Sequence, residues 1–189
     1  MAAKHVAVLL AEGFEEIEAV TVIDVLRRAG IEVAIAATAS RAIAVTGAHG
    51  IQVMADTQIG AVDAGGCDLV VLPGGMPGSE NLAGNPDVLK LVRQVWQRGG
   101  MVAAICAAPI ALHAAGLLDG RRATVYPSFV PRLTGVQCLD APVVVDQRVI
   151  TSRGPGTAFA FALELLRQLG AADQAETLAE GMLLPPGAQ

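Results

Sequence analysis

The sequence is poor in aromatic residues and in cysteine. Phe, Trp and Tyr make up 3% of its 189 residues, so the core must be built mainly from Ala, Val, Leu and Ile. The three cysteines, Cys67, Cys106 and Cys138, are an odd number without a CxxC pair, which argues against a disulfide framework and against a zinc knuckle. Reduced cysteines are typical of a cytoplasmic protein.

Charged residues are also scarce, at 16% of the chain with a net charge of −5. No block of Lys and Arg is present, and nucleic-acid binding through phosphates is therefore not expected. Residues 99–118 carry no formal charge and are long enough for a bilayer, but their Gly and Pro favour a strand, a turn and a helix. The apolar run 6–11 ends at Glu12, so neither a secretory signal nor membrane attachment is expected.

Short apolar strands alternate with amphipathic helices along the chain. Strands are expected at 5–10, 32–37, 69–72, 101–105, 123–125, 143–146 and 149–151, with a hairpin-like insertion at 43–45 and 51–54. Helices are expected at 15–29, 85–99, 107–115, 129–133, 157–169 and 173–182, and the fifth is expected to bury Phe159, Leu163, Leu166 and Leu169. This alternation predicts an α/β fold, with a mostly parallel sheet covered by helices on both faces.

Cys106 lies where an apolar strand runs into a helix, in the sequence MVAAICAAP. This is the pattern of a nucleophile elbow, in which a sharp turn presents the side chain above a sheet. A helix N-terminus stabilises a thiolate, which predicts a thiol pKa well below about 8.5, and the N–H of Ala107 is available to an oxyanion. A free cysteine is often only a small buried apolar residue, and Cys67 and Cys138 are expected to be packing residues of that kind.

Glu18 stands out because it begins an otherwise apolar helical stripe. The stripe continues with Val22, Val25, Leu26 and Ala29. A carboxyl group buried in this way tends to be protonated and can donate a hydrogen bond to a thiolate, whereas Glu15 and Glu16 are better placed to cap the helix dipole. The glycines of Pro73-Gly74-Gly75 follow a strand and allow close approach to a ligand, although such a pair also occurs in simple turns.

No histidine is placed to pair with Cys106. His113 is seven residues further along the expected helix, about 10 Å away along its axis. His5 begins a strand and is expected to be structural or exposed, and His49 lies in the hairpin-like insertion without an assigned role.

Several motifs occur in a fixed order over nearly the whole chain. They are EEIE at 15–18, DVLRRAG at 24–30, VVLPGG at 70–75, AAICAAP at 103–109 and TSRGPGT at 151–157. On these motifs the sequence resembles the ThiJ/PfpI superfamily, in the branch of the parkinsonism-associated protein deglycase and its bacterial YajL-like relatives. The resemblance implies a single domain over residues 1–189, a flavodoxin-like three-layer sandwich (class I glutamine amidotransferase-like), and a homodimer.

The resemblance also implies a set of site residues. They are a reactive Cys106, a protonated Glu18, backbone donors at Gly75 and Ala107, and Gly74 and Tyr126 in the pocket. No cofactor and no metal are implied. Ala107 stands where PfpI-type proteases have a histidine, which argues against a peptidase. Tyr126 stands where the family's cofactor-free enzymes often have a histidine, and a phenol is a poor base near pH 7, so low turnover is expected.

The implied function is cysteine-dependent, cofactor-free handling of reactive aldehydes. This means glyoxalase III or protein deglycase activity on methylglyoxal, glyoxal and their early adducts with amines or thiols. The Cys106 thiolate would add to the aldehyde, and Glu18 would move a proton, giving lactate or glycolate. One alternative is a redox-responsive stress protein or chaperone, in which Cys106 is oxidised to a sulfinate. A thiamine-pathway role rests only on an old family name.

Overall fold

The computed structural model describes residues 4–39 and 43–185. The strands are β1 (His5–Leu10), β2 (Glu32–Ala37), β3 (Ala44–Thr46), β4 (Gln52–Met54), β5 (Thr57–Gln58), β6 (Leu69–Leu72), β7 (Met101–Ile105), β8 (Arg122–Ala123), β9 (Gln137–Cys138), β10 (Val143–Asp146) and β11 (Val149–Ser152). The helices are α1 (Glu16–Arg28), α2 (Gly78–Gly84), α3 (Pro86–Gln97), α4 (Pro109–Ala114), α5 (Ala158–Gln168) and α6 (Ala172–Gly181). Short 3-10 turns are η1 (Ile59–Ala61), η2 (Pro127–Arg132) and η3 (Pro155–Thr157).

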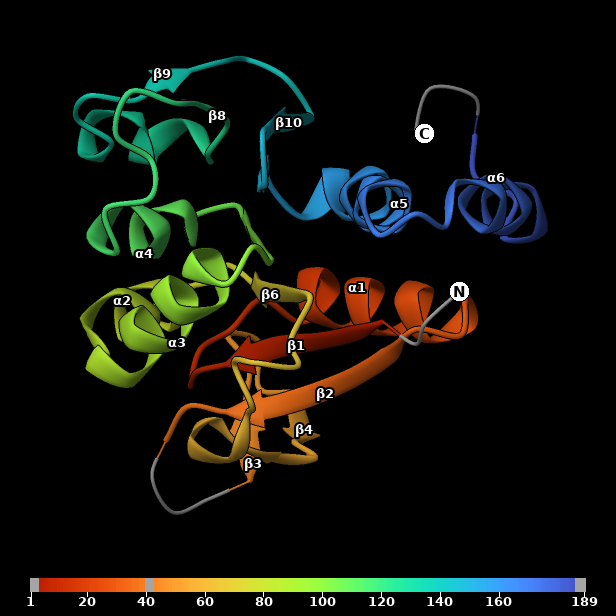
Figure 1. The fold of residues 1–189 in the computed structure, drawn as a ribbon, viewed down its shortest axis with the longest axis horizontal. Helices are drawn as coiled ribbons and strands as arrows, with labels where there is room; N and C mark the ends of the chain where they lie inside the picture. The colour runs from red at the N-terminus through yellow and green to blue at the C-terminus, as the bar shows by residue number, and fades with distance from the viewer. Residues whose placement is uncertain (1–3, 40–42, 186–189) are drawn as a thin grey trace.

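Seven strands form the central sheet in the order β10-β11-β7-β6-β1-β2-β5. Figure 1 shows its members β6, β1 and β2 next to one another. All neighbouring strands are parallel except the hairpin of β10 and β11. The insertion after β2 is the antiparallel pair β3 and β4, as the sequence predicts. Because β1, β6 and β7 are parallel neighbours, their carboxyl ends and the loops that follow lie at one edge of the sheet.

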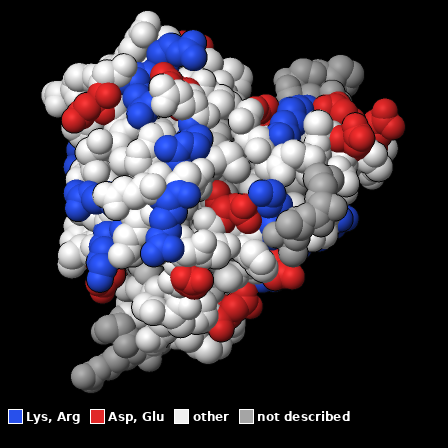
Figure 2. Space-filling view, viewed as in Figure 1, with Lys and Arg blue, Asp and Glu red and all other residues white. Residues whose placement is uncertain are grey.

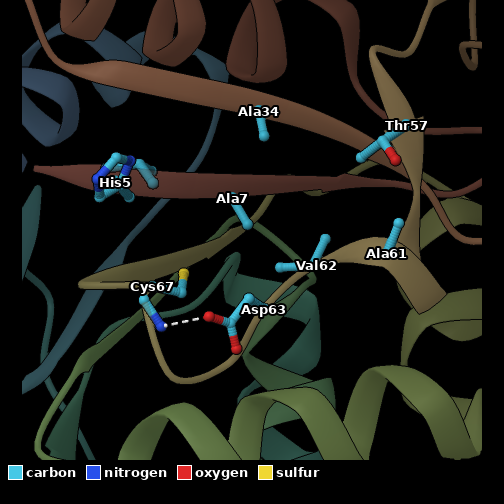
Figure 3. A pocket seen from close by; sticks show the side chains of 10 residues that line it. His5, Ala7, Ala34, Thr57, Ala61, Val62, Asp63 and Cys67 are labelled. Carbon is cyan, nitrogen blue, oxygen red and sulfur yellow. Dashed lines mark hydrogen bonds between the residues drawn. The ribbon is translucent and has the colours of Figure 1, made fainter.

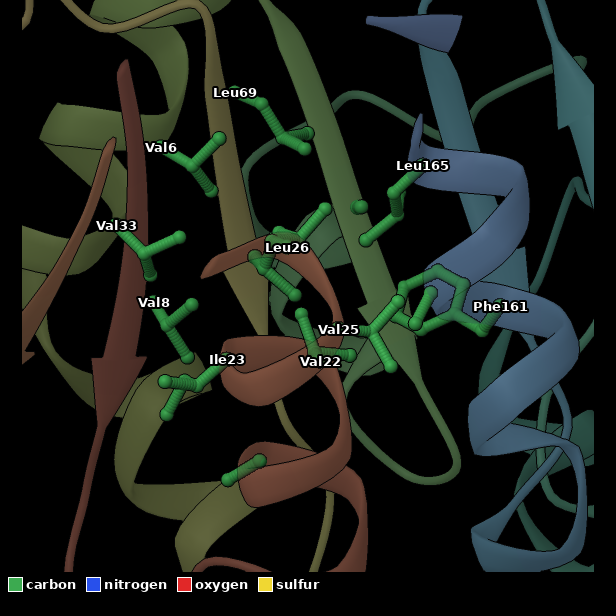
Figure 4. Packing of buried hydrophobic residues seen from close by; sticks show 14 of the residues in the cluster. Val6, Val8, Val22, Ile23, Val25, Leu26, Val33, Leu69, Phe161 and Leu165 are labelled. Carbon is green, nitrogen blue, oxygen red and sulfur yellow. The ribbon is translucent and has the colours of Figure 1, made fainter. Parts of the chain in front are cut away.

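Helices cover both faces because side chains of each strand alternate between two cores. In β1, Val6, Val8 and Leu10 belong to one core, whereas Ala7 and Leu9 belong to the other. Figure 4 shows the first core, in which α1 contributes Val22 and Leu26 and α5 contributes Phe161 and Leu165. Helices α2, α3 and α4 contribute to the second core. The flavodoxin-like three-layer α/β sandwich is therefore confirmed.

Two details of the helices differ from the sequence prediction. Helix α4 begins at Pro109 rather than at 107, because residues 106–108 form a tight turn and proline suits the first helical position. Phe159 is 38% exposed instead of buried. The buried side of α5 is centred on Phe161 and Leu165, and two residues correspond to about 200° around a helix, so Phe159 points away.

The described ranges contain no helix that is both long enough and apolar enough to cross a membrane. The uncharged residues 99–118 contain β7, a turn and α4. On the face shown in Figure 2, Lys and Arg side chains are spread out, with Asp and Glu side chains among them.

Candidate active site

Cys106 directly follows β7 and adopts a backbone conformation that is rare for a residue with a side chain. Its φ is +63°. Hydrogen bonds on both sides hold this turn: its N–H donates to the carbonyl of Ser152 at 2.9 Å, and its carbonyl accepts from the N–H of Tyr126 at 2.9 Å. A left-handed conformation costs about 1–2 kcal/mol for such a residue, and such strain is concentrated at functional sites. The strand-to-turn geometry predicted for Cys106 is present.

Glu18 reaches the same place from α1. Its side chain is fully buried, and its Oε2 accepts a hydrogen bond from the N–H of Gly74 at 2.7 Å. A Cβ atom at Gly74 would lie 2.5 Å from that oxygen and 2.6 Å from Cβ of Cys106. Only glycine allows this approach, so Gly74 touches the carboxyl and thiol residues rather than lining an open pocket. Oε1 of Glu18 is buried and has no hydrogen-bond partner among the described residues.

The loops that carry these residues are fastened to one another. The N–H of Glu15 donates to the carbonyl of Gly74 at 2.8 Å, and the N–H of Gly78 donates to the carbonyl of Gly13 at 3.2 Å. Gly75 has a φ of +89°, and a side chain there would collide with the backbone at Glu15. The loops after β1, β6 and β7 therefore bring Glu18, the Gly74–Gly75 segment and Cys106 together.

Burial raises the pKa of Glu18 to about 7. The N–H of Gly74 and the thiol of Cys106 act in the opposite direction, while the negative charge of Glu15 adds to the rise. A carboxyl group with a pKa near 7 is present in both protonation states at neutral pH, which suits it to accept and return a proton.

Burial also raises the pKa of Cys106, to about 12, and the charge of Glu18 and its hydrogen bond add to this rise. The N–H groups of Ala107 and Gly75 lower the pKa in part. The predicted low thiol pKa is therefore wrong, because α4 begins only at Pro109 and has six residues, so the sulfur is not at a helix N-terminus. The thiol and the carboxyl titrate as a pair, and the pair loses its first proton near pH 7.

The raised pKa of Glu18 predicts a stability that falls with pH. The stabilisation is complete below the unfolded pKa of 4.5 and is lost as pH rises through 7, by about 3 kcal/mol in total. Urea unfolding at pH 5 and pH 8 should show wild type losing roughly 2–3 kcal/mol more than Glu18→Gln, which has no charge to bury. An equal loss in both proteins would contradict the burial of an ionisable carboxyl at this place.

A groove lies beside the site, with a volume of about 450 Å³. Its lining includes Tyr126, Pro127, Ser128, Arg153, Gly154 and Thr157. Tyr126 is 45% exposed and its ring lies against Gly154, while its backbone N–H holds Cys106. Tyr126 therefore lines a groove next to the Cys106 turn, and Cys106 itself is not among the residues that line the groove.

A second hollow, of about 340 Å³, lies between β1, β2 and residues 57–67 (Figure 3). Its walls include Ala7, Ala34, Val62 and Cys67, and none of the residues around Cys106 lines it. Cys67 is buried, its thiol donates to the carbonyl of Leu69 at 3.2 Å, and burial raises its pKa. These contacts agree with the packing role predicted for Cys67.

The sequence does not reveal the surroundings of Glu15, Glu16 and His49. Glu15 is the N-cap of α1 and Glu16 its first residue, as the capping interpretation requires, but both are buried and meet His49 of the β3–β4 turn. His49 is 33 residues from Glu16, so no local pattern connects them. The other histidines are far from this group: His5 pairs with Glu32, and His113 contacts the carbonyl of Thr134.

The fold and the site define a class, namely flavodoxin-like α/β proteins with a cysteine on a strained turn beside a buried carboxyl group. The model of the DJ-1/PfpI family matches residues 4–168. Protein dj-1beta of Drosophila melanogaster is 40% identical over 183 residues, which cover 96% of this chain and 97% of that protein. The crystal structure of Drosophila DJ-1beta superimposes with a TM-score of 0.93 at 40% identity, covering 97% and 99% of the two chains. The chain belongs to the DJ-1/PfpI family.

Two further relatives are informative, one because of its name and the other because of its length. The glutathione-independent glyoxalase DJR-1.2 of Caenorhabditis elegans is 35% identical over 188 residues, covering 97% of this chain and 99% of that protein. Protein DJ-1 homolog A of Arabidopsis thaliana is 39% identical over 186 residues, covering 97% of this chain. The chain spans about half the length of that plant protein, 47% of it.

Proposed function

We propose that the protein converts small reactive aldehydes to hydroxy acids without a cofactor, and that Cys106 is the nucleophile. The observation that carries the proposal is the Cys106–Glu18 pair, with the N–H groups of Gly75 and Ala107 directed at the sulfur. A relative of nearly the same length is named a glutathione-independent glyoxalase, which supports the aldehyde chemistry.

The reaction with methylglyoxal begins as sulfur attacks the aldehyde carbon. The Glu18 carboxylate takes the thiol proton and passes it to the aldehyde oxygen, which gives a hemithioacetal and returns Glu18 to its carboxylate form. Glu18 then moves a proton from the former aldehyde carbon to the neighbouring carbon through an enediol, leaving a thioester of lactate. Water hydrolyses the thioester, releasing lactate and the free thiol, so the sum is methylglyoxal plus water giving lactate.

The backbone donors and Tyr126 have different parts in this scheme. The N–H groups of Gly75 and Ala107 stabilise negative charge as it develops near the sulfur. A phenol is a poor substitute for an imidazole in proton transfer, so Glu18 has to perform the proton transfers alone and turnover should be low. The same chemistry applies to early adducts of glyoxals with amines or thiols, whose leaving group would accept the proton.

Lactate formation from methylglyoxal tests the proposal. Purified protein, freed of glutathione and of contaminating glyoxalases, should produce lactate in proportion to its concentration. Absence of lactate at high protein concentration would contradict the enzymatic function.

A second candidate function is supported by the buried Oε1 of Glu18, which has no partner within the described residues. Two molecules of hydrogen peroxide would oxidise the thiol of Cys106 to a sulfinic acid and leave two of water. A protonated Glu18 and the N–H groups of Gly75 and Ala107 would then bind the sulfinate oxygens. Peroxide treatment should add two oxygen atoms at Cys106 by mass spectrometry. We also propose that the protein is located in the cytoplasm. This reducing compartment would keep the thiol of Cys106 available between oxidation events.

We also propose that the protein is a homodimer through the outer face of α1 and the β3–β4 hairpin. Ile17, Val20, Ile51 and Met54 are each 47–59% exposed. Ile51 is held beside the start of α1, because its N–H donates to Oε1 of Glu16 at 3.3 Å. Apolar side chains gathered in this way are typical of a surface that another chain covers.

Light scattering should therefore give twice the chain mass of 19.3 kDa. Val20→Glu places a charge in the patch and should shift the mass to that of one chain. Val130→Glu is a matched control, because Val130 is 43% exposed in η2, which lies outside the patch. A wild-type protein that remains at 19.3 kDa at micromolar concentration would contradict the dimer.

A further inference from the structure

Three metal-ligating side chains meet beside the start of α1. They belong to Glu15, Glu16 and the exposed His49 of the β3–β4 turn, and one ligand atom of each lies within 4.8 Å of the others. Nδ1 of His49 is 2.8 Å from Oε2 of Glu16 and 3.5 Å from Oε2 of Glu15. None of these side chains has a direct part in the reaction proposed for Cys106.

The carboxylate of Glu15 is little exposed and has few partners. Its side chain is nine-tenths buried, yet it accepts no hydrogen bond from any residue within 4–39 and 43–185, and only Nδ1 of His49 approaches it. Two carboxylates this close repel each other, and a divalent cation between them relieves that repulsion. Glu16 has the histidine and two backbone N–H donors as partners, whereas Glu15 has the histidine alone.

We propose that Glu15, Glu16 and His49 form a zinc-binding site, with one Oε2 from each glutamate and Nδ1 of His49 as ligands. Zinc accepts imidazole nitrogen and carboxylate oxygen at about 2.0–2.2 Å, so tetrahedral ligand atoms lie roughly 3.3 Å apart. The two distances around Nδ1 are close to this spacing. The fourth position is left to water or a ligand from solution.

The surroundings support the same atoms as ligands. Oε1 of Glu16 accepts hydrogen bonds from the N–H groups of His49, at 2.7 Å, and Ile51, at 3.3 Å. These bonds orient the carboxylate, and Oε2 then has His49 as its partner, from which an ion would take over both atoms as ligands. The His49 side chain is 67% exposed, which gives zinc a path from solvent. Binding requires the proton on Nδ1 to leave, to Nε2 in a neutral ring or to solvent in a charged one.

Calorimetric titration with Zn²⁺ alone tests the site, on the full chain after treatment with a chelator. Wild type and Cys106→Ser should both bind one zinc ion per chain at this site. In the Cys106→Ser background, His49→Gln and Glu15→Gln should each weaken binding at least tenfold. Ile51 of the proposed dimer surface is close to His49, so a substitution there could also change the assembly. Light scattering of each variant shows whether the assembly is unchanged.

His5→Gln is the matched control, since His5 pairs with one carboxylate, Glu32, at 2.9 Å but has no second one beside it. Zinc should raise the Tm of Cys106→Ser and of His5→Gln, and should not raise that of His49→Gln, which separates lost ligation from lost folding. Equal zinc affinity in His49→Gln and His5→Gln would overturn the proposal. Loss of all zinc binding in Cys106→Ser alone would place the metal at the thiol and would also overturn it.

Discussion

Cys106→Ala is expected to reduce lactate formation from methylglyoxal to the background rate. The side chain that forms the covalent bond is absent, and removing a nucleophile typically costs a thousandfold or more. Cys106→Ser keeps the shape and a weak hydrogen-bonding group but should fail as well, because a buried hydroxyl is a far poorer nucleophile than a thiol. Lactate measured over time with limiting methylglyoxal gives the rates.

Cys138→Ala is the control for this experiment. Cys138 is a free, partly exposed cysteine in the short strand β9, and its loss should leave the rate unchanged. Far-ultraviolet circular dichroism shows whether each variant remains folded. Substantial lactate formation by folded Cys106→Ala would exclude Cys106 as the nucleophile and, with it, the proposed reaction.

Glu18→Gln is expected to have the second largest effect. Glutamine can accept the hydrogen bond of Gly74 and retains the shape, but it cannot exchange a proton, so aldehyde turnover should fall by roughly 100- to 10,000-fold. The pH dependence of Cys106 alkylation should change too. In wild type the rate should rise only at alkaline pH, and in the variant the rise should move to lower pH, because the charge of Glu18 no longer opposes the thiolate although burial still does.

Iodoacetamide rates, measured with Cys67 and Cys138 replaced by alanine, would report on Cys106 alone. Glu12→Gln changes an exposed carboxylate in the loop before α1 and should leave both the rate and the midpoint unaltered. If Glu18→Gln formed lactate as fast as wild type, Glu18 would be a structural residue only.

The sequence predicted the parts of the fold that depend on local pattern. Strands β1, β2, β6 and β7 occupy the predicted residues, because each is an apolar run bounded by polar residues, Gly or Pro. The buried position of Glu18 followed from its place on an apolar helical stripe, and the turn at Cys106 followed from a strand that meets a helix.

Long-range contacts decided what the sequence could not predict. The pKa of Cys106 depends on how deeply three loops bury the sulfur and on a carboxyl group 88 positions earlier in the chain. Likewise, the meeting of Glu15 and Glu16 with His49 depends on how the β3–β4 hairpin docks onto α1. The exposure of Phe159 depends on which side of α5 faces the sheet, and helical periodicity alone did not define that side.

The left-handed backbone at Cys106 lowers the stability of the fold at the residue that the proposed activity requires. At a φ of +63°, glycine would relieve about 1–2 kcal/mol of backbone strain and would remove the thiol together with it. Selection for a robust fold alone would therefore tend to erase the reactive group. A lineage that keeps cysteine at this position is maintaining the chemistry at a continuing cost in folding free energy.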